Sequence, residues 1–273
     1  MKDFNDKTVV ITGGATGIGF GLAKKFGERG AKIVIGEPRQ NRLDEAIAKL
    51  NAVNIEASAM VMDVTDENSV EALADFAWST YGGVHVLINN AGIAIPRAPI
   101  TEAPLSDMRR LFDVNFFGVW LGAAIFGKRM IEQGEPAAIY NVASENAFFN
   151  AVQNSAAYIA SKHAVRGLTE AMRDDFPDFI QVGMIIPGFV ASEMTAGSAK
   201  FAMDADTFAA KVVDQIAAGE FYVVTHAFNI ERIKPIHAKI EDSYARNAPR
   251  YEGDDEYDVP TLIARLTAGR DGT

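Results

Sequence analysis

The chain has 273 residues, of which 48% are hydrophobic, a formal net charge of -10 at pH 7 and no cysteine. This length is enough for one large hydrophobic core and does not require two domains. The lack of cysteine excludes disulfides and thiolate metal sites, and the acidic balance argues against nucleic acid or an anionic membrane as a partner. No apolar run reaches the ~20 residues of a membrane span, and the N-terminus lacks a secretory signal, so we expect a cytoplasmic protein.

Short apolar runs alternate with longer amphipathic stretches along most of the chain. The runs predict buried strands at residues 8–11, 31–36, 57–61, 84–88, 138–142, 180–186 and 221–225. The stretches predict helices at residues 18–29, 39–50, 67–80, 104–131 and 155–174. Near-continuous apolar strands that alternate with helices are typical of a parallel sheet covered on both faces. We therefore predict an α/β fold, with a single doubly wound Rossmann-type domain around a mostly parallel seven-stranded sheet.

Two regions fit this alternation less well. Residues 192–207 are rich in Met, Ala, Gly and Ser, which predicts a mobile loop or a short helix. Residues after 229 predict a helix followed by an acidic tail that contains Glu252-Gly253-Asp254-Asp255-Glu256. We accordingly divide the chain into a main domain at 1–228 and a C-terminal helix with an acidic tail at 229–273.

A glycine-rich turn, Thr12-Gly13-Gly14-Ala15-Thr16-Gly17-Ile18-Gly19, joins the first predicted strand to the first helix. Glycine permits a close approach of the backbone to a phosphate, and the helix N-terminus presents free N–H groups. The spacing departs from the commonest dinucleotide fingerprint, so a tight turn without a ligand is the alternative. Asp63 and the run Asn89-Asn90-Ala91-Gly92 follow the third and fourth strands, where ligands bind in open α/β sheets. Together they favour a dinucleotide-binding domain.

The second strand leads to Glu37, eighteen residues beyond Gly19. A carboxylate at this place can accept both hydroxyls of the adenosine ribose and would repel a 2′-phosphate, which favours NAD over NADP. Arg39 is an alternative signal, because an arginine nearby could bind that phosphate instead. We interpret Arg39 as a solvated residue in the first turn of the next helix and expect NAD.

Tyr158 and Lys162 stand four residues apart on a predicted helix, so both can point at one spot. A free tyrosine titrates near ~10. A lysine cation and the positive nicotinamide of an oxidised cofactor would favour the phenolate that accepts a proton from an alcohol. Ser144 follows the fifth strand and could hydrogen-bond the substrate oxygen. Asn115 is a polar residue between apolar ones. Each residue alone would be interpreted as a packing residue or a satisfied core amide, but together they predict hydride transfer on an alcohol or ketone.

These motifs, in this order, resemble the classical short-chain dehydrogenase/reductase family over roughly residues 4 to 225. The resemblance implies a catalytic tetrad of Asn115, Ser144, Tyr158 and Lys162, with Asn115 supporting a water that relays protons to Lys162. It implies a cofactor site made of Gly13, Thr16, Gly17, Ile18, Gly19, Glu37, Asp63, Val64, Asn90, Ala91, Gly92, Tyr158, Lys162, Pro187, Gly188, Val190 and Ser192. It also implies a homotetramer or homodimer.

The chain departs from the family pattern at Glu145, directly after Ser144, and in its C-terminal ending. That ending is loosely similar to bacterial aryl-alcohol dehydrogenases of the lignin type, so we expect an apolar or aromatic secondary alcohol or the matching ketone. Candidate pocket residues are Ile93, Ile95, Phe148, Phe149, Asn150, Phe189, Met194 and Phe201. No Arg or Lys lies between Ser144 and Tyr158 to anchor an anionic substrate, and the histidines predict no metal site.

Two other functions remain open. One is an NADPH-preferring ketone reductase in which Arg39 binds the phosphate. The other is a catalytically silent dinucleotide-binding sensor or scaffold that uses the acidic tail to bind a partner. The complete tetrad argues against the silent alternative.

Overall fold

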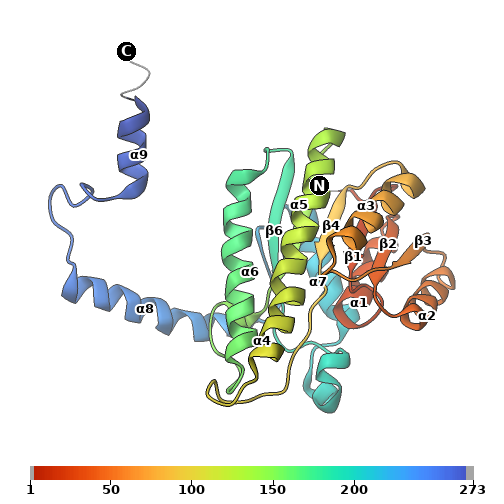
Figure 1. Cartoon of the computed structure of the whole chain (residues 1–273), viewed down its shortest axis with the longest axis horizontal. Coiled ribbons are helices and arrows are strands. Elements are labelled where there is room, and N and C mark those ends of the chain that lie inside the picture. Colours follow the sequence, from red (N-terminus) through yellow and green to blue (C-terminus); the bar gives the residue numbers. More distant parts are fainter. Residues whose placement is uncertain (1–2, 269–273) are drawn as a thin grey trace. The chain divides into compact units, whose positions relative to one another are not determined.

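A computed structural model describes residues 3–268 of the chain, and the sheet is its central layer (Figure 1). Within these residues, seven strands pair in the order β3-β2-β1-β4-β5-β6-β7 and all pairs are parallel. The strands are β1 (Thr8–Thr12), β2 (Lys32–Glu37), β3 (Ala57–Val61), β4 (Val86–Asn89), β5 (Ala137–Val142), β6 (Ile180–Ile186) and β7 (Tyr222–Val224). The order reverses between β1 and β4, which makes the doubly wound topology. The predicted α/β fold is therefore confirmed.

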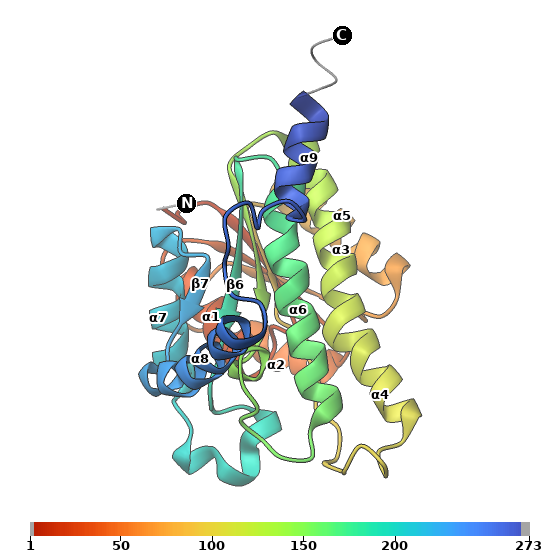
Figure 2. The same cartoon turned by 90° about the vertical axis from the view of Figure 1, so that its left-hand side faces the viewer.

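Helices cover both faces of the sheet (Figure 2). On one face lie α1 (Gly17–Gly27), α2 (Gln40–Asn51) and α7 (Ala205–Ala218), whose Leu22, Leu43 and Phe208 join one core cluster. On the other face lie α3 (Glu67–Tyr81), α5 (Gly118–Gln133) and α6 (Ala156–Asp175), with Leu73, Phe126 and Met172 in a second cluster. Because both faces are covered, the central strands are apolar along their whole length, which is the pattern that the sequence shows.

The helix predicted at 104–131 is interrupted in the structure. It consists of α4 (Leu105–Phe112), a π-helical turn η1 (Asp113–Phe117) and α5. The interruption falls at Asn115, whose side chain bonds the backbone of Ile93 instead of facing an apolar neighbour. Periodicity alone cannot reveal such a turn, since it adds one residue to a helix without changing its composition.

The same stretch, Leu105–Gln133, is the one helix of the described chain that is long and apolar enough to span a membrane by composition. Half of its most apolar window is buried inside the protein. Ile125, Phe126 and Met130 pack in the cores beside the sheet. We interpret it as a core helix.

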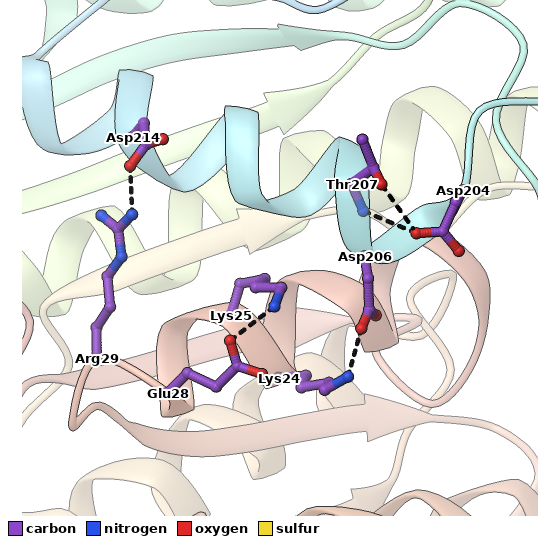
Figure 3. A network of polar contacts seen from close by, with 8 residues as sticks. All are labelled: Lys24, Lys25, Glu28, Arg29, Asp204, Asp206, Thr207 and Asp214. Atoms are coloured by element: carbon purple, nitrogen blue, oxygen red, sulfur yellow. Dashed lines mark hydrogen bonds and ion pairs between the residues drawn. The ribbon is translucent and has the colours of Figure 1, made fainter.

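The segment predicted as a loop or short helix at 192–207 contains a 3-10 helical stretch, η3 (Glu193–Phe201), with a break at Ser198. Helix α7, for which we made no prediction, begins at Ala205, where Asp204 caps it by accepting from the backbone N–H of Thr207 at 2.9 Å. Ion pairs then join α7 to α1: Lys24 with Asp206, and Arg29 with Asp214 (Figure 3). A Cβ atom on Gly21 would lie 2.9 Å from the carbonyl oxygen of Ala205, so the start of α7 packs closely on α1.

The chain divides by its internal contacts into two compact units, Met1–Asn229 and Ile230–Thr273. The second unit contains α8 (Ile230–Asn247), where the sequence predicted a helix, and α9 (Val259–Ala268), for which we made no prediction. The acidic run at 252–256 lies between these two helices.

Candidate active site

One cleft of about 1710 Å³ opens at the carboxyl edge of the sheet. Its walls come from the segments that follow β1, β2, β3, β4, β5 and β6, as expected for an open α/β sheet. All seventeen residues predicted to bind the cofactor line this cleft, from Gly13 in the glycine-rich turn to Ser192 before η3. Ser144 lines it as well, whereas Asn115 lies behind its wall. The volume is large enough for a dinucleotide together with a small substrate.

The glycine-rich turn is shaped as a cradle that side chains would fill. Gly13 and Gly17 have φ angles of 63° and 52°, in the left-handed region that favours glycine. A Cβ atom on Gly17 would lie 2.9 Å from the Cβ of Ser192, and one on Gly19 would lie 2.4 Å from the carbonyl oxygen of Gly13. Thr16, the N-cap residue of α1, makes no side-chain capping bond. The N–H groups of the first helical turn therefore remain available for a pyrophosphate, and the turn fits a dinucleotide.

The end of β4 holds this turn in place. The Thr12 hydroxyl accepts from the backbone N–H groups of Asn90 and Ala91 at 3.0 and 3.1 Å. The Asn90 side-chain amide donates to the carbonyl groups of Thr12 and Gly13 at 2.9 and 3.0 Å. Asn90 therefore has a structural role, which connects the loop after β4 to the phosphate end of the cleft.

Glu37 and Asp63 mark the adenosine end of the cleft. Glu37 closes β2 and is only 4% exposed. The Asp63 carboxylate accepts from both the backbone N–H and the hydroxyl of Thr65, at 2.9 and 2.8 Å. Arg39 is exposed, as predicted, with 46% of its side chain accessible, and it also forms ion pairs with Glu37 and with Glu193.

Tyr158 and Lys162 lie on α6 and face the same end of the cleft as Ser144. The ammonium group of Lys162, 4% exposed, donates to the carbonyl oxygen of Val142 at 2.9 Å and lies 5.8 Å from the centre of the Tyr158 ring. The Ser144 side chain hydrogen-bonds Tyr158 and also accepts from the backbone N–H of Asn146 at 3.1 Å. A hydroxyl, a phenol and an ammonium group thus surround one point.

Asn115 is fully buried in the π-helical turn η1. Its carbonyl oxygen accepts from the backbone N–H of Ile93 at 2.8 Å, and its amide donates to the carbonyl oxygen of Ile93 at 3.0 Å. A Cβ atom on Gly92 would lie 3.4 Å from this carbonyl oxygen and 3.8 Å from Nζ of Lys162. Asn115 therefore anchors the loop after β4 and lies across a small gap from Lys162.

Burial dominates the charges at this end of the cleft. It lowers the pKa of Lys162 to about 8, because no carboxylate lies beside the ammonium group to offset the loss of water. Burial also raises the pKa of Tyr158, against the hydrogen bond from Ser144, which lowers it. In the protein without cofactor, burial therefore outweighs the effects that lower the pKa of Tyr158. A further positive charge is needed beside the phenol.

Glu145 lies next to these groups. Burial raises the pKa of its carboxyl, while a hydrogen bond with Asn229 lowers it. Its negative charge contributes in turn to the raised pKa of Tyr158. The residue that departs from the family pattern is thus part of the reactive end of the cleft.

The predicted substrate pocket is half right. Ile93, Ile95, Phe189 and Met194 line the cleft, whereas Phe148, Phe149, Asn150 and Phe201 do not. Phe148 instead packs under the guanidinium group of Arg166, at 4.4 Å from its ring centre. Arg97 and Arg110, in the loop and helix after β4, also line the cleft. From the sequence we considered only residues 144–158 as anchors for an anionic substrate and did not name these two arginines. No local pattern marked them, since only the path of that loop brings them to the cleft.

The parallel sheet and the glycine-lined cleft at its carboxyl edge define a nucleotide-binding α/β protein of the Rossmann type. A family model described as short chain dehydrogenase matches residues 7–202. The chain belongs to the short-chain dehydrogenase family, whose members bind a nicotinamide dinucleotide and act on hydroxyl or keto groups. The resemblance found in the sequence is confirmed.

Individual relatives agree with this assignment. The chain is 33% identical over 229 residues to a 1-deoxy-11-beta-hydroxypentalenate dehydrogenase from Streptomyces avermitilis, covering 81% of this chain and 84% of that one. It is 34% identical over 199 residues to a C alpha-dehydrogenase from Sphingobium sp., covering 72% and 65%. A short-chain dehydrogenase/reductase from Burkholderia phymatum, solved in complex with NAD, superposes with a TM-score of 0.84 at 28% identity, covering 89% and 97%.

Proposed function

We propose that this chain is an NAD-dependent dehydrogenase of apolar or aromatic secondary alcohols that can also reduce the matching ketones. The observation that carries the proposal is the meeting of Ser144, Tyr158 and Lys162 at one end of a cleft whose other end is a glycine cradle and a nearly buried carboxylate, Glu37. The proton-transfer groups and the nucleotide site therefore share one space. Ile93, Ile95, Phe189 and Met194 give the walls an apolar character, which suits an apolar substrate.

In the proposed reaction the hydroxyl proton of the alcohol moves to the phenolate oxygen of Tyr158 while the C–H bond of the carbinol carbon breaks. Oxidised NAD, when bound, would place a positive charge beside the phenol and would accept the hydrogen of that C–H bond with its electron pair, as a hydride. The Ser144 hydroxyl orients the substrate oxygen and stabilises its developing charge. Lys162 adds a cation 5.8 Å from the centre of the Tyr158 ring. Asn115 holds the loop after β4 in place by accepting a hydrogen bond from the backbone N–H of Ile93. Ketone reduction is the reverse, with Tyr158 as the proton donor.

The choice of NAD rests on Glu37. Its carboxylate is 4% exposed at the end of β2, where the ribose hydroxyls of a dinucleotide bind in this fold. A second negative charge brought to this place by a 2′-phosphate would be repelled. The solved relative in complex with NAD supports the same choice.

The substrate class rests on two relatives and on the walls of the cleft. The C alpha-dehydrogenase from Sphingobium sp. and the hydroxypentalenate dehydrogenase from Streptomyces avermitilis are both named for the oxidation of a carbon centre in a larger molecule. Arg97 and Arg110 lie among the apolar residues of the cleft, so a polar or acidic group distant from the carbinol is compatible with it.

The test is a panel of secondary alcohols, aryl and alicyclic, mixed with the enzyme and NAD and followed by the absorbance of NADH. Turnover of aryl or alicyclic alcohols above that of short aliphatic ones is the expected result. No turnover of any alcohol, with NAD shown to bind by calorimetry, would favour the silent sensor instead.

A further inference from the structure

Glu193 is a charged residue of the cleft that the proposed reaction does not use. It begins η3, directly after Ser192, and its two carboxylate oxygens are divided between two arginines. One oxygen lies 2.8 Å from Nη1 of Arg39 and the other lies 2.6 Å from Nη2 of Arg42. A hydrogen bond from Thr16 completes its contacts, and the bond from Arg39 holds the pKa of its carboxyl below the usual range. Glu193 is therefore ionised at neutral pH.

Of the two arginines, Arg39 lines the cleft, and Arg42 is close to it on the same segment of the chain. Arg39 is the N-cap residue of α2 and Arg42 lies in its first turn, just beyond Glu37. Arg39 is also paired with Glu37, and Arg42 with Glu45 at 3.1 Å. Arg39 and Arg42 are thus matched by three carboxylates, so each of these two guanidinium groups already has an anionic partner.

Two guanidinium groups that converge on separate oxygens of one anion form the arrangement that a phosphate group requires. In this protein the anion is supplied by the chain itself. The ribose hydroxyls of NAD need Glu37 and leave the Glu193 pairs in place. A 2′-phosphate needs the two arginines and must displace the Glu193 carboxylate from them.

We propose that Glu193 is a specificity-determining residue that occupies Arg39 and Arg42 and so keeps the 2′-phosphate of NADP from binding them. The inference deepens the proposed function, since it rests on a site that takes NAD. It also explains why Arg39 does not make this chain an NADP enzyme. The ion pairs also tie η3 to α2 at the adenosine end of the cleft.

The test is Glu193→Gln, which keeps the size and shape of the side chain and removes its charge. Calorimetric titration with adenosine 2′,5′-bisphosphate and with ADP measures the effect without the nicotinamide. We expect the variant to bind the 2′,5′-bisphosphate about tenfold or more tightly than the unaltered enzyme does, with ADP changed less than about threefold. NADPH and NADH should follow the same pattern.

The matched control is Glu45→Gln, which removes the same charge beside the same Arg42 but leaves the Glu193 pairs intact. The proposal would be overturned if Glu45→Gln raised the affinity for the 2′,5′-bisphosphate as much as Glu193→Gln does, or if the affinity for ADP rose equally. Either result would mean that the loss of any negative charge in this region has the same effect. In the double variant Glu193→Gln/Arg39→Ala the increased affinity for the 2′,5′-bisphosphate should disappear, since the freed guanidinium group is removed. An increased affinity that persists in this double variant would also overturn the proposal. The titrations measure binding and need no turnover. They can therefore be interpreted even if the enzyme oxidises none of the alcohols tested.

Discussion

At the scale of single residues, the site combines groups that cost stability with groups that carry the proposed chemistry. Lys162 is a buried ammonium group whose contacts are a carbonyl oxygen and an aromatic ring. Tyr158 has a raised pKa because it is buried too. Unfavourable burial of this kind is typical of functional sites, where a poised group is kept at the expense of stability. Two predictions separate the chemical role of each residue from its structural role.

Tyr158→Phe should reduce turnover of the best alcohol by about a hundred- to ten-thousandfold, because only the titrating hydroxyl is lost. The ring and its packing remain, so NAD should bind with little change. Steady-state kinetics and calorimetric titration of NAD measure the two effects. Turnover within about tenfold of the unaltered enzyme would exclude Tyr158 as the acid or base.

Lys162→Met should stabilise the enzyme without cofactor at pH 7. The folded-state pKa of Lys162 is about 8, below the ordinary 10.5, so the unfolded chain binds more protons between these pH values. The cost of burying the charge is absent above pH 10.5 and fully present below pH 8. Allowing for the lost bond to Val142, the free energy of unfolding should rise by about 1–3 kcal/mol at pH 7.

Thermal unfolding at pH 7 and at pH 10 measures this effect. The Tm of Lys162→Met should exceed that of the unaltered enzyme by several degrees at pH 7, and the difference should shrink at pH 10. A Tm difference that is the same at both pH values would mean that Lys162 is not buried in its charged form. Lys162→Met should lose activity at both pH values.

At the scale of elements, close packing of helices on the sheet decides which residues are tolerated. Helix α5 crosses β4 so closely that a Cβ atom on Gly122 would lie 2.1 Å from the side-chain amide oxygen of Asn89. That oxygen is itself buried without a hydrogen-bond partner among the described residues. Gly167 in α6 is exposed, and a Cβ atom there would meet nothing within 4 Å. These two helical glycines therefore predict opposite effects of one substitution.

Gly122→Ala should lower the free energy of unfolding by about 1–3 kcal/mol, because the new methyl group has no space. Gly167→Ala should raise it by about 0.5–1 kcal/mol, because alanine loses less backbone entropy in a helix. Urea unfolding of both variants measures the pair. Equal signs for the two substitutions would show that α5 does not pack on β4 as described.

At the scale of the whole molecule, α4 and α5 present large apolar side chains to solvent. Leu105, Phe117, Trp120 and Ile131 are 58%, 51%, 53% and 45% exposed. The other stripe of these helices already packs on the sheet, so this second stripe needs a partner. We propose that a second copy of the chain covers it, in a homodimer or homotetramer.

Light scattering at micromolar concentration should therefore give a multiple of the 29.5 kDa chain mass. Trp120→Glu should shift the mass toward one chain while the far-UV circular dichroism stays unchanged. The matched control is Val53→Glu, because Val53 is as exposed as Trp120 but is distant from α5. This substitution should leave the mass unchanged. A mass of one chain for the unaltered protein would contradict the proposal.

The sequence by itself determined the fold class and most of the strands, because a sheet buried on both faces requires apolar runs at regular intervals. It also placed Gly13, Glu37, Ser144, Tyr158 and Lys162 correctly at strand ends or on one helical face, since those positions follow from local spacing. The role of these residues in binding and catalysis stays a proposal. Local spacing was misleading where a helix contained a π-helical turn at Asn115, and for the predicted pocket residues Phe148, Phe149, Asn150 and Phe201.

Only the tertiary structure decided how distant parts of the chain act on one another. Glu193 and Arg39 are 154 residues apart, and their ion pair exists because the segments after β6 and β2 reach the same cleft. Arg97 and Arg110 likewise reach the cleft only through the path of the segment after β4. The low pKa of Lys162 also depends on what surrounds it, since burial removes water without supplying a carboxylate. Such long-range contacts leave no periodic signal in the sequence, because they depend on the paths of loops. The composition of a loop does not determine its path.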